Sequence, residues 1–141
     1  MMTDADVGSH MVYSIKNQEV VEVQCVTLDS IIQHEDSEFA ITKIDVEGME
    51  LKVLKGSLTA IIQGKLPVIL FETNGLNKRY GISEGQICQF LSQNNYLLGN
   101  YDADNKVFTI DNKIKEDNYA IKGDRIDELE KRIKGVKIRG V

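Results

Sequence analysis

The sequence predicts an α/β fold built on a mainly parallel sheet that ends in an antiparallel hairpin. Strand-like and helix-like segments alternate along most of the 141 residues, which is the pattern of strands joined by right-handed helical crossovers. Residues 96–101 and 106–110 both look like strands and are separated only by a turn, so they predict the hairpin. The most continuously apolar stretch, residues 66–72, belongs at the centre of the sheet.

The composition is that of one globular domain. Apolar residues make up 42% of the chain and charged residues 28%, which excludes a disordered chain. No apolar run approaches the length that spans a bilayer, and the first residues do not resemble a signal peptide. Cys25 and Cys88 lie far apart and predict buried thiols in a reducing compartment. We therefore expect a soluble, cytoplasmic protein with no membrane partner.

The charge is unevenly distributed. The net charge is −5, yet the last eleven residues carry five basic groups and no acidic one. The rest of the chain is strongly acidic, which argues against binding to a phosphate backbone. The sequence thus predicts no nucleic-acid partner.

The pattern divides the chain into three parts. Residues 8–11 read GSHM, which is typical of the remnant of an expression tag, so we assign residues 1–11 to such a remnant. Residues 12–121 form the predicted domain. Residues 122–141 form a predicted helical, basic tail, with Ile126, Leu129 and Ile133 on one helical face.

The first elements are predicted from local spacing. Val21, Val23 and Cys25 alternate with polar residues, which indicates a strand within residues 19–26. A short helix follows, capped by Thr27 or Asp29.

The next strand and helix carry the clearest pattern. Residues 39–46 are apolar at most positions, as expected for a strand covered on both faces. Residues 49–62 have helical spacing, and Gly56 is expected to bend or restart that helix. Pro67 starts the strand of residues 66–72, where a missing N–H group does least harm.

The remaining elements complete the sheet. Ser83 is expected to begin a helix with Glu84 in its first turn. The hairpin strands follow, and residues 118–121 predict a last short extended segment.

Two carboxylates lie at the carboxyl ends of predicted strands, which is where open α/β sheets bind their ligands. Asp45 ends the strand of residues 39–46, and Glu72 ends the strand of residues 66–72. If these strands are neighbours, both acids face one crevice, with Glu47 and Glu50 at the start of the next helix. The alternative is structural, because acids in a first helical turn are common and Glu72 might only accept backbone hydrogen bonds. Lys43 lies two residues back along the strand, on the same face as Asp45, and is expected not to offset the charge of these acids easily.

Three segments carry a resemblance to a known family. Residues 26–32 (VTLDSII), 41–61 (ITKIDVEGMELKVLKGSLTAI) and 67–74 (PVILFETN) occur in this order and spacing in the FkbM family of S-adenosylmethionine-dependent methyltransferases. The resemblance covers about residues 20–110. It implies a class I methyltransferase sandwich, which is Rossmann-like. Residues 43–46 would lie on its fourth strand, residues 68–72 on its fifth, and the hairpin would supply its last two strands.

The same resemblance implies a chemical role for the carboxylates. Asp45, Glu72 and Glu47 would be catalytic residues that orient or deprotonate a small-molecule or sugar hydroxyl. S-adenosylmethionine would be the methyl donor, and no metal site is expected because no Cys and His spacing suits one.

The glycine-rich turn that holds the donor in class I methyltransferases finds no counterpart in this sequence. The chain therefore resembles only the C-terminal half of the family domain. We expect a fragment that is inactive alone and does not bind the donor tightly, and no residue is assigned to cofactor binding. The alternatives are a non-catalytic interaction domain, or a half-domain completed in trans. Since the fourth strand would then be an exposed apolar edge, a homo-oligomer through this edge is also expected.

Overall fold

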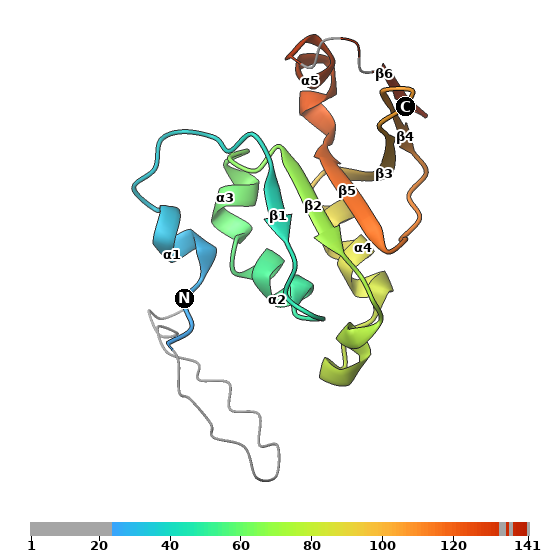
Figure 1. Cartoon of the computed structure of the whole chain (residues 1–141). Helices are drawn as coiled ribbons and strands as arrows, with labels where there is room; N and C mark the ends of the chain where they lie inside the picture. Colours follow the sequence, from blue (N-terminus) through green and yellow to red (C-terminus); the bar gives the residue numbers. More distant parts are fainter. Residues whose placement is uncertain (1–23, 133–134, 136, 141) are drawn as a thin grey trace.

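The computed structural model describes residues 24–132, 135 and 137–140. In chain order its elements are α1 (Leu28–Ile32), β1 (Thr42–Ile44), α2 (Glu50–Lys55), α3 (Leu58–Ile62), β2 (Val68–Glu72), the 3₁₀ helix η1 (Leu76–Tyr80), α4 (Glu84–Gln93), β3 (Tyr96–Asp102), β4 (Val107–Ile110), β5 (Asp117–Lys122), the 3₁₀ helix η2 (Gly123–Arg125), α5 (Ile126–Arg132) and β6 (Lys137–Arg139). The predicted alternation of strands and helices is confirmed up to β3 (Figure 1).

The six strands form one mixed sheet in the order β1-β2-β5-β3-β4-β6. The strands β1 and β2 are parallel, as are β4 and β6. The other three neighbouring pairs are antiparallel. The expectation of a mainly parallel sheet is therefore wrong for the described residues, although the α/β class is right.

The difference arises from the place of β5. The hairpin of β3 and β4 forms as predicted, but it does not close the sheet. The short segment that ends in Lys122 enters the sheet between β2 and β3 and pairs antiparallel with both. A third strand, β6, then pairs with β4 on its outer side.

One face of the sheet is covered by helices. Buried side chains of β1, β2 and β3 pack with those of α2, α3 and α4 in a single core, which includes Ile44, Ile69, Phe71, Leu54 and Leu91. In Figure 1 α4 lies behind the sheet, while β1, β2 and β5 are seen without a helix in front of their lower parts. A smaller apolar cluster on the other face joins β4, β5 and α5.

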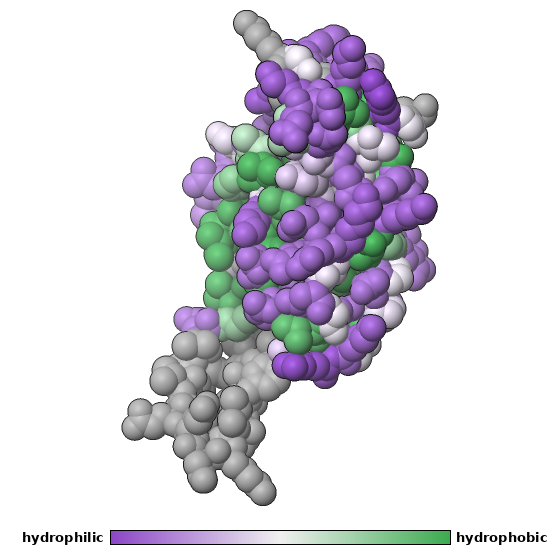
Figure 2. Space-filling model, turned by 45° about the vertical axis from the view of Figure 1, so that its right-hand side comes forward, coloured by the Kyte–Doolittle hydropathy of each residue, from purple (hydrophilic) through white to green (hydrophobic). Residues whose placement is uncertain are grey.

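That other face is largely open. Along β2 the buried residues Ile69 and Phe71 alternate with the half-buried Val68, Leu70 and Glu72. The strand β1 is buried on one face only as well, since Ile44 is buried and Lys43 is exposed. The prediction that residues 39–46 form a strand covered on both faces is therefore wrong. Figure 2 turns this face to the left and shows a band of hydrophobic side chains there, flanked by hydrophilic ones.

The upper part of the open face is hollowed into an apolar groove of about 320 Å³. It is lined by Ile41, Val68, Tyr101, Phe108, Tyr119, Ile121, Leu129 and Ile138. The helix α5 borders it. Glu38, in the loop before β1, binds Arg125 of η2 at 2.7 Å and Arg132 of α5 at 2.9 Å.

Two helix starts follow the predicted capping chemistry. Thr27 caps α1 by accepting a hydrogen bond from the Ser30 N–H at 3.2 Å. Ser83 and Gln86 form a reciprocal capping box at the start of α4. Asp29, the other candidate for the first cap, instead accepts hydrogen bonds from the N–H groups of Thr59 and Ala60 at 2.8 and 2.9 Å. It thus caps α3, some thirty residues further along the chain.

Replacement of Asp29 by Ala is expected to destabilise the protein. Two N–H groups at the start of α3 would lose their acceptor, at a cost of about 1 kcal/mol. Urea unfolding measures this as a lower midpoint with an unchanged slope. Asp36→Ala, a change in the exposed loop before β1, is the matched control. Equal midpoints for the two variants would show that the Asp29 cap contributes nothing.

A buried lysine ties the sheet to two helix ends. Lys122 is only 8% exposed, and its Nζ donates to the carbonyl oxygens of Ile61 at 3.2 Å and Asn94 at 2.8 Å. The same ammonium lies 4.9 Å from the centre of the Tyr96 ring. The carbonyl oxygens at the C-terminal ends of α3 and α4 thus accept hydrogen bonds from a cation. The helix dipoles favour a positive charge at these ends.

The predicted tag remnant, residues 1–11, and most of the strand predicted within residues 19–26 lie outside the described residues. Residues 24–26 are described and form no strand. The restart of the helix at Gly56 is confirmed, since α2 ends at Lys55 and α3 begins at Leu58. Within the described part of the chain no helix is long and apolar enough to cross a membrane.

Candidate functional site

The structure brings Asp45 and Glu72 to the same end of the sheet. Ile44 pairs with Phe71 in the parallel register of β1 and β2, so Asp45 and Glu72 are the next residues along and stand side by side. Neighbouring strands are about 4.8 Å apart. Both residues lie on the open face, because their neighbours Ile44 and Phe71 point into the helix-covered core.

A third carboxylate extends the pair into a row across three strands. Asp117, the first residue of β5, is the register partner of Glu72. We call Asp45, Glu72 and Asp117 the carboxylate row. Asp45 and Asp117 are exposed and Glu72 is half-buried, so the row opens onto solvent at one end of the open face.

The crowding of negative charge changes how Glu72 titrates. The neighbouring Asp45 is the largest cause that raises the pKa of Glu72 above its ordinary value of 4.5, and partial desolvation, Asp117 and Glu47 act in the same direction. A carboxyl group with a raised pKa binds a proton more tightly than a free carboxyl group does. Glu72 is therefore the strongest candidate base among the three.

A single lysine balances part of this charge. The Nζ of Lys43 lies 3.0 Å from Oδ2 of Asp45, although the sequence predicted that Lys43 would not easily help. The two residues share the open face because they are separated by one residue on an extended strand. The hydrogen bond to Asp45 raises the pKa of Lys43, so the ammonium stays charged beside the row.

Glu47 is held at the edge of the site by the loop after β2. Its Oε2 accepts a hydrogen bond from Nδ2 of Asn74 at 2.8 Å. Asn74 in turn accepts from the Leu76 N–H at 3.1 Å through its own Oδ1. Glu47 thus adds negative charge near Glu72, while its carboxylate is already engaged by an amide.

The turn that carries Glu47 needs a glycine. Glu47 and Gly48 both have positive φ, at 53° and 100°. A Cβ at Gly48 would lie 2.6 Å from the backbone N of Asn77 and the backbone C of Leu76. Glu50, which is 2% exposed, closes the turn by accepting from the Gly48 N–H at 2.9 Å. Glu50 is therefore a buried turn residue and does not join the carboxylate row.

The loop that brings Asp117 to the row is fastened to the end of β2. Thr73 donates from its backbone N–H to the carbonyl of Glu116 at 2.8 Å. Asn118, which is 1% exposed, donates to the Lys115 carbonyl at 2.8 Å and to Oγ1 of Thr73 at 3.1 Å. These bonds fix where β5 begins, and hence the position of Asp117.

The described residues offer no group of three or more His, Cys, Asp or Glu side chains that could hold a metal ion. The carboxylate row is instead suited to a cationic or hydrogen-bond-donating ligand, since ionised carboxylates only accept.

Comparisons with known proteins give one match. A family model described as the methyltransferase FkbM domain matches residues 3–98, a stretch that includes Asp45, Glu47 and Glu72. Searches among curated proteins and among solved structures each found no match.

Proposed function

The chain belongs to the FkbM methyltransferase family, and on this premise we propose that the carboxylate row is the acceptor side of an S-adenosylmethionine-dependent O-methyltransferase. The observation that carries the proposal is the raised pKa of Glu72 beside Asp45, at the carboxyl ends of two parallel neighbouring strands. Open α/β sheets bind their ligands at such ends.

The residues suit the donor that the family generally uses. When bound, S-adenosylmethionine supplies an electrophilic methyl group on a positively charged sulfur. A row of carboxylates with one lysine favours a positive charge nearby. The acceptor hydroxyl would lie over the row, where it can donate a hydrogen bond to a carboxylate.

Each carboxylate has a different role in this proposal. Asp45, fixed by Lys43 at 3.0 Å, orients the acceptor hydroxyl. Glu72 takes its proton, which makes the oxygen a better nucleophile. Glu47, engaged by Asn74, helps to keep the pKa of Glu72 raised and is a positioning residue.

We expect donor binding by this chain alone to be weak. The described residues contribute the carboxylate row, and no glycine-rich donor turn is evident in the sequence. Calorimetric titration with S-adenosylmethionine should therefore show no binding in the low micromolar range. Tight binding would mean that the donor site is built from other residues and would overturn this part of the proposal.

The proposal as a whole is tested by a transfer assay. The chain is incubated with an excess of methyl-labelled S-adenosylmethionine, which offsets weak donor binding, and with a panel of hydroxylated acceptors, including sugars. Label in each acceptor is measured, and transfer would replace the expectation from the sequence that the chain is inactive alone. Label in a hydroxyl-bearing acceptor, together with loss of label on removal of that hydroxyl group, is the expected result. Label that appears only on amines, or none with any acceptor while the donor is bound, would contradict it.

A further inference from the structure

Asp117 and Glu72 form a close pair across two strands. They face each other in the antiparallel register of β2 and β5. The next pair in that register, Thr73 and Glu116, is hydrogen-bonded, because the Thr73 N–H donates to the Glu116 carbonyl at 2.8 Å. Hydrogen-bonded and non-hydrogen-bonded pairs alternate along an antiparallel ladder, so Asp117 and Glu72 form a non-hydrogen-bonded pair. The Cα atoms of such a pair are only about 4.5 Å apart, and its side chains point to the same face.

This pair carries two negative charges. Like charges directly opposite each other destabilise a pair of strands. In the part of the chain that the structure describes, neither carboxylate has a hydrogen-bond or ion-pair partner. Lys115, two residues before Asp117, binds Asp111 at 3.4 Å instead, and Lys43 is already bound within the row. The charge of Asp117 is therefore available to a ligand.

The fold holds the pair together in spite of this repulsion. Asn118 is 1% exposed and follows Asp117 in the chain. Its Oδ1 accepts from the Lys115 N–H at 2.7 Å, and its Nδ2 donates to Oγ1 of Thr73 at 3.1 Å. These buried bonds prevent the start of β5 from moving away from the end of β2. A local conflict that the surrounding structure maintains is typical of a functional site.

The spacing of the two carboxylates suits a ligand with two donors. Ionised carboxylates only accept hydrogen bonds, and side chains in such a pair start about 4.5–5.5 Å apart at their Cβ atoms. A lone hydroxyl group that binds Glu72 would leave Asp117 without a donor. Two neighbouring hydroxyl groups of one molecule supply a donor to each carboxylate.

We propose that Asp117 is a specificity-determining residue, which accepts a hydrogen bond from a second hydroxyl group of the acceptor while Glu72 takes the proton of the hydroxyl that is methylated. The acceptor class is then a diol or polyol, such as a sugar. Asp117 itself forms and breaks no covalent bond. The inference rests on the proposed function and assigns a role to a carboxylate that the proposed division of roles leaves unused.

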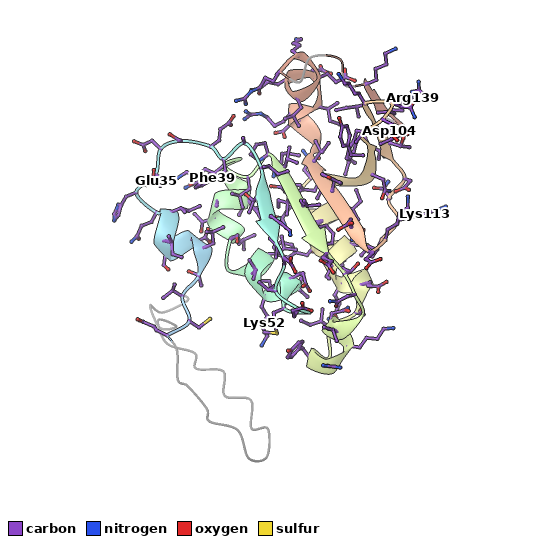
Figure 3. The ribbon with its side chains drawn as sticks, in the orientation of Figure 1. Glu35, Phe39, Lys52, Asp104, Lys113 and Arg139 are labelled. Carbon is purple, nitrogen blue, oxygen red and sulfur yellow. The ribbon has the colours of Figure 1, made fainter. Side chains whose placement is uncertain are left out.

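The facing of the two carboxylates is tested without methyl transfer. Asp117→Asn keeps the size of the side chain and removes its charge, which is one of the causes that raise the pKa of Glu72. The midpoint of Glu72 in a nuclear magnetic resonance titration is expected to fall in Asp117→Asn and to stay unchanged in Asp104→Asn. Figure 3 shows Asp104 at the upper right, away from the lower ends of β1 and β2. A midpoint that Asp117→Asn does not move would overturn the proposal.

The specificity is tested with matched acceptors. Each acceptor that takes up label is compared with deoxy analogues that lack one neighbouring hydroxyl group. The ratio of kcat/KM between the polyol and its least active analogue is expected to fall about tenfold in Asp117→Ala, a usual loss for a hydrogen bond to a charged group. A change in the basicity of Glu72 affects both acceptors alike and cancels in this ratio. Asp117→Asn keeps an acceptor oxygen and should retain part of the preference, and Asp104→Ala should retain all of it.

The possible outcomes separate this inference from the proposed function. Asp117 is exposed, so Asp117→Ala is expected to fold, and circular dichroism checks this. An unchanged ratio in the folded variant would overturn the role of Asp117 and leave methyl transfer standing. Faster transfer to an analogue with an amine in place of the second hydroxyl would also overturn it, because Asp117 would then bind a cation. Absence of transfer to every acceptor would overturn the proposed function and this inference with it.

Discussion

Replacement of Gly48 by Ala is expected to destabilise the protein by about 2–5 kcal/mol, because backbone strain and overpacking act together. The φ of Gly48 is 100°, a region that alanine rarely adopts. The added Cβ would also lie 2.6 Å from backbone atoms of Leu76 and Asn77. Backbone atoms cannot move aside as a flexible side chain does, so the turn and η1 must separate.

Urea unfolding measures the loss, and Gly85→Ala is the control. Gly85 lies in the first turn of α4, where an added Cβ meets only Oγ of Ser83 at 3.8 Å. That change is expected to be neutral or to stabilise by about 0.5–1 kcal/mol, since alanine favours helix more than glycine does. Equal effects of the two changes would show that the turn after β1 tolerates a side chain.

The substitution Asp45→Asn is expected to lower methyl transfer about 10²–10⁴-fold, the usual contribution of a group that manages a proton. The amide keeps the shape of the side chain but removes the negative charge that orients the acceptor and raises the pKa of Glu72. Asp45 is exposed, so the fold is expected to persist.

The rate is measured with the acceptor identified in the transfer assay. Asp104→Asn, in the exposed turn between β3 and β4, makes the same chemical change away from the row and should leave the rate unchanged. An Asp45→Asn variant that turns over as fast as the unchanged chain would remove Asp45 from the reaction.

The sequence alone predicted the elements that depend on residues close together in the chain. The apolar spacing predicted the helices and the break at Gly56, and Ser83 predicted the start of α4. The motif positions also led to the carboxylates after β1 and β2, because in a parallel α/β arrangement the ends of neighbouring strands meet. The adjacency of Asp45 and Glu72 is thus a consequence of the predicted order of elements.

Features that depend on distant contacts were not predictable in the same way. The short β5 enters the middle of the sheet, and its buried Lys122 binds carbonyls of α3 and α4, which a local pattern does not reveal. The place of β5 also brings Asp117 into the row, so the sequence reading missed this residue. The sequence also did not predict the open face, because Val68 and Leu70 are apolar on the side of β2 that only α5 partly covers.

The most direct test of the central claim is a carboxyl-detected nuclear magnetic resonance titration of Glu72, carried out on the unchanged chain and on Asp45→Asn. The claim is that the charge of Asp45 raises the pKa of Glu72, so removal of that charge should lower the pKa of Glu72. We predict that Glu72 has a midpoint above 4.5 in the unchanged chain, and that this midpoint falls in Asp45→Asn but not in Asp104→Asn. A midpoint at the ordinary value of 4.5 that Asp45→Asn leaves unchanged would contradict the account.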